Sequence, residues 1–197
     1  MQAEASPDGA ASGVDATSQV VLFRIDTTNT EARFIIGEVL RGEPNIVVGV
    51  ANQVSGVLAI DFGDIAGSRV GDVQVNARTF VTDEPLRNRA IQNSILQTSD
   101  FEYITFSPVS IAGWPETLAF GVPYTLQIDG ELKIRDMSQL IMFEVRVTLI
   151  SEQRLEGLGH ATIRREDFGL NIPSVPYVAE VEMDTWLEID FVALAAE

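Results

Sequence analysis

The sequence predicts an all-β protein in which antiparallel strands form one strongly coiled sheet or closed barrel. Apolar and polar residues alternate with a period of two through most of the chain after residue 18, as in strands with one apolar and one solvated face. Several of these segments exceed eight residues, a length that favours a coiled sheet or barrel over a small sandwich. Parallel strands buried on both faces would not alternate in this way.

Each alternating segment assigns its apolar residues to one face, which we take as the inward face. In chain order this face contains Ala32, Phe34 and Ile36; Val54, Gly56, Leu58 and Ile60; Val73, Val75 and Ala77; Leu126, Ile128, Gly130, Leu132 and Ile134; Phe143, Val145, Val147 and Leu149; and Leu187, Ile189 and Phe191.

One segment between these strands has helical periodicity. Thr82 to Pro85 supplies a capping residue, early acids and a proline suited to a first turn. The apolar residues that follow recur at helical spacing, which predicts a helix over about residues 84–98. A second irregular stretch, Phe168 to Val178, contains two prolines and predicts a loop with a short helical turn.

Length and composition indicate one globular domain over residues 20–197. The chain has 197 residues, of which 46% are hydrophobic and 21% charged, so disorder of the whole chain is excluded. It has no cysteine, which excludes disulfides and thiolate metal sites. The net charge of −16 repels phosphate backbones and anionic lipids, so we expect no nucleic-acid partner. No stretch reaches the length of a membrane span.

Residues 1–19 are rich in Ala, Ser and Gly and have too few bulky apolar side chains to fold by themselves. They also lack the apolar run of a signal peptide. Two interpretations follow. The segment is either a disordered cytoplasmic N-terminus or a spacer that followed a signal or a membrane anchor.

The sequence shows no catalytic or metal-binding constellation. His160 is the only histidine, and its parity places it on the outward face, so it can build neither a zinc site nor a catalytic triad. The tripeptide Asp167–Gly169 matches a kinase motif whose other parts are missing. Acidic pairs such as Glu180 and Glu182 are typical of solvated strand ends. We therefore expect a protein that is not an enzyme and has no cofactor.

Several short motifs, in a fixed order, resemble those of a known family: Phe34–Glu38, Val54–Asp61, Val73–Thr79, the helix segment Arg87–Ile91, Tyr103–Ser107, Ile128–Ile134 and Arg164–Gly169. Over about residues 20–194 the chain resembles the YceI-like family of lipocalin-like polyisoprenoid-binding proteins. The resemblance implies an eight-stranded antiparallel barrel with the helix packed across one opening. It also implies export to the periplasm or the cell exterior, which favours the spacer interpretation of residues 1–19. One position departs from the pattern, since some relatives have histidine where this chain has Glu38. Its parity is that of Phe34 and Ile36, so we expect it to face the lumen or its mouth, where it would repel an anionic head group.

Two functions from different classes are compatible with such a barrel. In the first, the lumen binds an apolar chain, a polyisoprenoid or similar lipid, because small inward residues leave space: Gly56, Ala77, Gly130, Gly157, Gly159 and Ala161. In the second, phenylalanine rings fill the lumen, and the protein is a structural subunit that binds a copy of itself or another cell-envelope protein. For the first function we predict ten ligand-binding residues: Phe34, Ile36, Leu58, Val75, Phe106, Ile128, Phe143 and Val145 in the lumen, with Ile91 and Ile95 of the helix closing it.

The outward parity of His160 predicts that this side chain is dispensable. The variant His160→Ala should carry no less ligand than the parent protein, because no inward group is changed. Titration with an apolar ligand and elemental analysis for bound metal check this. A metal held by His160, or a loss of ligand binding in the variant, would contradict the prediction.

Overall fold

The computed structural model describes residues 19–174, 176 and 178–196. The predicted spacer, residues 1–19, lies outside the described residues except for Gln19. Within these residues thirteen strands form a single sheet, and every pairing between them is antiparallel. The strands are β1 (Val20–Ile25), β2 (Glu31–Leu40), β3 (Glu43–Ala51), β4 (Val54–Ser55), β5 (Val57–Asp61), β6 (Arg69–Val70), β7 (Val73–Asn76), β8 (Tyr103–Ala112), β9 (Pro123–Ile134), β10 (Met137–Ser151), β11 (Arg154–Arg164), β12 (Val178–Val181) and β13 (Asp184–Ala195).

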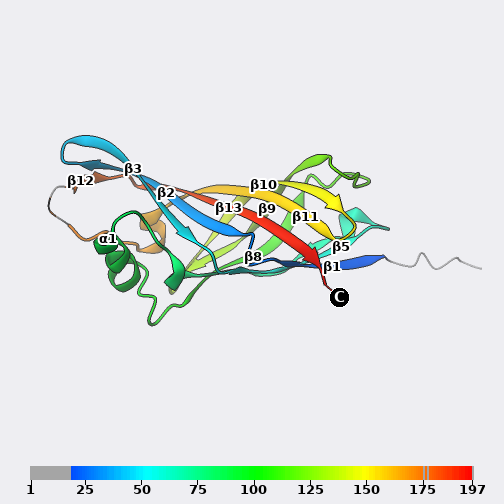
Figure 1. Ribbon diagram of the computed structural model, residues 1–197, viewed down its shortest axis with the longest axis horizontal. Coiled ribbons are helices and arrows are strands. Elements are labelled where there is room, and N and C mark those ends of the chain that lie inside the picture. Colours follow the sequence, from blue (N-terminus) through cyan, green and yellow to red (C-terminus); the bar gives the residue numbers. More distant parts are fainter. Residues whose placement is uncertain (1–18, 175, 177, 197) are drawn as a thin grey trace, which may run out of the picture.

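The sheet curls until its hydrogen-bonded order returns to its starting point (Figure 1). From β4 the order runs through β7, β8, β9, β10, β11, β13 and β1 to β5. Gly56 alone separates β5 from β4, so these two strands are halves of one bent strand that pairs with β1 on one side and β7 on the other. The predicted antiparallel barrel is therefore confirmed.

The strand count is higher than the eight that were expected because bends divide some barrel strands, and because β3 and β12 pair with β2 outside the main strand order. β13 pairs with β2 over residues 186–190 and with β1 over residues 193–195, so β1 and β2 are successive parts of one side of the barrel. Asp26 holds the turn between them by accepting hydrogen bonds from the Asn29 side chain (2.7 Å) and the Thr28 backbone N–H (3.0 Å). These bonds hold the pKa of the Asp26 carboxyl below its ordinary value.

The predicted helix is present but shorter than expected. Glu84 caps α1 (Pro85–Ala90) by accepting a hydrogen bond from the Leu86 backbone N–H, and the helix continues as a π-helical turn, η3 (Ile91–Ile95). Gln97 has a φ of +50° and ends the helical path. Figure 1 shows α1 at one end of the molecule, near the tip of β2 and β3. Among the described residues, no helix is long and apolar enough to cross a membrane.

The motif Arg164–Gly169 forms a short 3-10 helix, η4 (Arg165–Phe168), just before the loop that was expected from Phe168 to Val178. The Arg165 guanidinium donates hydrogen bonds to the backbone oxygens of Leu170, Val181 and Glu182. It thereby connects η4 to both ends of this loop. The other 3-10 turns are η1 (Ile65–Gly67) and η2 (Ala77–Thr79).

Aromatic rings occupy the space above glycines on neighbouring strands. A Cβ atom at Gly130 would lie 2.5 Å from Cζ of Phe106, and one at Gly157 would lie 2.5 Å from Cζ of Phe191. Gly49 is covered in the same way by the Phe34 ring. The expectation that small inward residues leave free volume therefore fails at Gly130 and Gly157. These glycines make room for rings of the protein itself.

The packing of Phe106 on Gly130 predicts a large cost for one added methyl group. Gly130→Ala should lower the free energy of unfolding by about 1–3 kcal/mol, because the ring and the Ser107 carbonyl oxygen, 2.7 Å from the new Cβ, would both have to move. Urea denaturation measures the change. Gly71→Ala is the matched control, since its Cβ would meet nothing closer than 3.3 Å.

A second substitution separates ring overlap from a backbone effect. Adding Phe106→Leu to Gly130→Ala should cost clearly less than the sum of the two single changes, because the shortened side chain no longer overlaps the methyl group. Full additivity of the two substitutions would contradict the packing described here.

Candidate functional site

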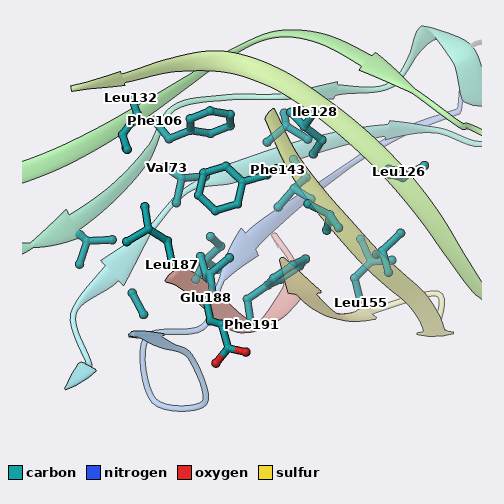
Figure 2. Close-up of a pocket in the computed structure, with 18 of the residues that line it drawn as sticks. Val73, Phe106, Leu126, Ile128, Leu132, Phe143, Leu155, Leu187, Glu188 and Phe191 are labelled. Carbon is teal, nitrogen blue, oxygen red and sulfur yellow. The ribbon is translucent and has the colours of Figure 1, made fainter. Parts of the chain in front are cut away.

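An apolar cavity of about 150 Å³ lies inside the barrel. Inward side chains of most barrel strands converge on it, and Figure 2 shows Phe143 between Phe106 and Ile128 on one side and Leu187 on the other. The lining consists of Ile25, Ala32, Arg33, Leu58, Ile60, Val70, Val73, Val75, Phe80, Ile104, Phe106, Trp114, Leu118, Leu126, Ile128, Leu132, Ile134, Phe143, Val145, Val147, Leu149, Leu155, Leu187, Glu188, Ile189 and Phe191.

The cavity is long and narrow. On β9 its lining extends from Leu126 to Ile134, nine residues that span about 26 Å of strand. Yet its volume matches cavities that hold a single benzene ring, and it is smaller than the roughly 300–1,000 Å³ of typical sites for drug-sized ligands. The lining is therefore long enough for a slender chain, but the free volume holds only a short part of one, so a longer chain or a fused-ring molecule would enter only if the lining rings move.

The structure brings six of the ten predicted residues together in this lining: Leu58, Val75, Phe106, Ile128, Phe143 and Val145. The other four, Phe34, Ile36, Ile91 and Ile95, do not line it. The Phe34 ring lies over Gly49 and contacts Phe80, at 5.4 Å between ring centroids, so Phe80 stands between Phe34 and the cavity. Residue parity correctly indicates the face of a strand, but it does not indicate how deep a side chain lies.

The two helix residues close the interior by packing. Ile91 is buried in the core, and Ile95 packs against that core without reaching the cavity. Hydrogen bonds fix this region: Arg135 of the β9–β10 turn donates to the Ile95 carbonyl, and Gln92 donates to the carbonyl of Arg78. These isoleucines therefore close the interior by packing and do not line the cavity, and their part in ligand binding stays a prediction.

Several lining residues have no periodic signal in the sequence. Trp114 and Leu118 belong to the loop between β8 and β9, and Phe80 follows the 3-10 helix η2. The sequence feature that could have indicated Trp114 is a large apolar residue between Gly113 and Pro115, two residues that are typical of loops. Its position against the cavity depends on the fold of that loop.

The cavity lining is almost free of charge. Its charged residues are Arg33 and Glu188, which face each other on β2 and β13, with 3.9 Å between Arg33 Nη1 and Glu188 Oε2. Arg33 also pairs with Glu31 at 2.8 Å. In Figure 2 the Glu188 carboxylate points away from the apolar side chains. Among the described residues, no cluster of three His, Asp or Glu could hold a metal ion.

Glu38 does not line the cavity and is paired with Arg87, which corrects the expectation that it faces the lumen. Its carboxylate is buried, with 6% of the side chain exposed, and accepts hydrogen bonds from Arg87 (3.0 Å) and Asn45 (2.9 Å). The Arg87 guanidinium is 20% exposed and also pairs with Asp83. Glu38 therefore attaches α1 to the β2–β3 hairpin, and its charge is neutralised away from the cavity.

His160 lies on the outer face, as its parity predicted. Its ring stacks on Trp186 with 4.9 Å between centroids and an interplanar angle of 10°. Its Nε2 atom is 3.7 Å from a carboxylate oxygen of Glu144. The side chain thus takes part in surface packing between β10, β11 and β13. Whether ligand binding depends on it stays a prediction.

The burial of Glu38 predicts that α1 depends on Arg87. Arg87→Met should lower the free energy of unfolding by about 2–3 kcal/mol, because it leaves a buried carboxylate without its cation; the cost falls below that of a fully buried pair because Arg87 is partly exposed. Adding Glu38→Gln should recover most of the loss. Denaturant titration measures both variants.

Arg164→Met is the matched control, because its pair with Glu166 is exposed on both sides and should contribute less than about 1 kcal/mol. Equal losses from Arg87→Met and Arg164→Met would contradict the role of the Glu38 pair.

Comparisons with known proteins agree with this architecture. A YceI-like domain model matches residues 23–193. The solved structure of a polyisoprenoid binding domain from Saccharophagus degradans, implicated in plant cell wall breakdown, is 14% identical, with a TM-score of 0.71 over 89% of this chain and 99% of that one. Burkholderia cenocepacia BcnA is 16% identical, with a TM-score of 0.65 over 85% and 98% of the two chains. A Campylobacter jejuni YceI protein is 16% identical, with a TM-score of 0.59 over 76% and 84%. None of the curated protein sequences compared with the chain matches it.

Proposed function

The chain belongs to the YceI-like family, and from this premise we propose that its barrel binds one apolar chain, a polyisoprenoid or similar lipid, in the cavity along its axis. The observation that carries the proposal is the cavity itself, which is enclosed by aliphatic and aromatic side chains over most of a long strand. The polyisoprenoid binding domain from Saccharophagus degradans, with a similar fold, supports the same ligand class.

The physical basis of binding is removal of apolar surface from water. Each buried CH₂ group contributes about 0.8 kcal/mol, so affinity grows with the length of chain that enters. The narrow cross-section selects against wide ligands, and the near absence of charge in the lining selects against a charged group inside the barrel. Binding of this kind needs no cofactor and no chemical change of the ligand.

One observation favours the second candidate, a structural subunit with a filled barrel. The Phe34, Phe106 and Phe191 rings already cover inward glycines, and Phe106 and Phe191 also line the cavity. In that case the outer surface would carry the function, through a homodimer or a cell-envelope partner. A protein that carries no lipid when purified and binds none in titration would favour this candidate.

We propose a periplasmic or extracellular location, with residues 1–19 as the spacer between the barrel and a membrane anchor. The proposal rests on the family resemblance and on the Ala-, Ser- and Gly-rich composition of residues 1–19. Cell fractionation of the native host, with detection of this chain in the soluble, membrane and periplasmic fractions, tests it.

Blocking the cavity separates the two candidate functions. Val75 lines the cavity from β7, next to Ile104 on β8. Val75→Trp should abolish binding of geranylgeraniol, measured by native mass spectrometry, at an overpacking cost of at most about 1–3 kcal/mol. Gln74→Trp, on the exposed face of the same strand, should leave binding unchanged.

In a filled barrel the same Val75→Trp substitution should unfold the protein, and the parent protein should bind no geranylgeraniol. Scanning calorimetry of both variants, beside the binding measurement, distinguishes the cases. Unfolding of Val75→Trp together with a parent protein that binds no ligand would mean that the proposed function is wrong.

A further inference from the structure

The indole of Trp114 carries a buried hydrogen-bond donor that has no partner. Trp114 lines the cavity, and its Nε1 atom is buried without a hydrogen bond to any described residue. An indole N–H can only donate, so no rotation of a neighbouring donor can satisfy it. Because buried polar groups in proteins are nearly always paired, such an atom points to a missing acceptor.

The loop that carries Trp114 is built against the cavity wall. Gly113 has a φ of +92°, and its Cα lies so close to β9 that an added Cβ would stand 2.7 Å from the Thr125 carbonyl oxygen. At the other end of the loop, the Gly121 N–H donates to the Leu149 carbonyl on β10. The loop therefore spans two strands whose residues Leu126 and Leu149 line the cavity, and it holds Trp114 at that end.

We propose that Trp114 is the head-group site of the barrel: its Nε1–H donates a hydrogen bond to a neutral oxygen, a hydroxyl or carbonyl, on the lipid whose chain occupies the cavity. This inference rests on the proposed function and adds to it the polarity and orientation of the ligand. The oxygen lies at the end closed by the β8–β9 loop, and the chain runs toward Ile134 and the helix.

The charges around the cavity support a neutral head group over a diphosphate. Among the described lining residues, Arg33 is the only cation, and Glu31 and Glu188 already pair with it. The net charge of the chain, −16, adds a repulsive field for an anion. The single uncharged donor, the Trp114 N–H, lies in an apolar lining and therefore suits an uncharged acceptor oxygen on the ligand.

Three probes with the same prenyl chain test the assignment: geranylgeraniol, the hydrocarbon that lacks its hydroxyl group, and geranylgeranyl diphosphate. Each probe competes with a fluorescent fatty-acyl ligand. The parent protein should bind the alcohol about three- to tenfold more tightly than the hydrocarbon, the difference expected for one neutral hydrogen bond. It should bind the diphosphate more weakly than the alcohol.

Trp114→Phe removes the donor and keeps an aromatic ring. The variant should bind the hydrocarbon as the parent does and lose the preference for the alcohol. Trp186→Phe, on the outer face beside His160, is the matched control and should keep the preference. The chain has two tryptophans, so Trp186→Phe also assigns the indole N–H signals in an NMR spectrum of the parent protein.

The NMR readout tests the contact in the parent protein, so it does not require Trp114→Phe to fold. The Trp114 N–H signal should move downfield on binding of the alcohol and not on binding of the hydrocarbon. If Trp114→Phe keeps the preference for the alcohol, or if the Trp114 N–H signal responds equally to the alcohol and the hydrocarbon, the head-group site is overturned. Water would then be the partner of Nε1. Tighter binding of the diphosphate than of the alcohol would also overturn it. A parent protein that binds none of the three probes would refute the proposed function as well.

Discussion

The width of the barrel interior is the constraint on which the rest of the structure depends. An antiparallel sheet that closes on itself with few strands leaves an interior only wide enough for side chains or one slender ligand. Here the rings of Phe106 and Phe191 occupy part of that width, and glycines opposite them, Gly130 and Gly157, provide the space. A methyl group at either glycine would overlap a ring. The size of each inward residue is therefore set by its neighbour across the strands.

The cavity is the part of the barrel interior that these side chains do not fill. Because rings and aliphatic side chains take most of the cross-section, about 150 Å³ remains, distributed along a wall that extends from Leu126 to Ile134 on β9. A long cavity with a small cross-section favours an unbranched or slender apolar chain over a wide ligand. The apolar lining binds such a chain by removing its surface from water, without directional contacts. The unpaired Trp114 Nε1 is the exception among the lining residues, and we infer that it marks the end of the cavity beside the β8–β9 loop.

Charge is kept out of the interior by pairing. Glu38 would be costly if it were buried alone, but Arg87 brings a cation from the helix, and the pair attaches α1 to the β2–β3 hairpin. Arg33 and Glu188 pair in the same way on neighbouring strands next to the cavity. The excess negative charge of the chain thus remains outside, where it is solvated, and the cavity stays neutral.

The sequence by itself determined the antiparallel sheet, the place of its one helix and the inward face of each strand, because the period of side-chain alternation depends only on local backbone geometry. That parity correctly placed Leu58, Val75, Ile128 and Val145 in the lining and His160 on the outer face. Only the tertiary structure decided that Phe34 lies behind Phe80, that Glu38 is paired, and that a loop brings Trp114 to the cavity. These three placements depend on contacts between segments that are distant in sequence and on the depth at which a side chain lies. The alternation of residues along one strand carries no information about distant contacts or about depth.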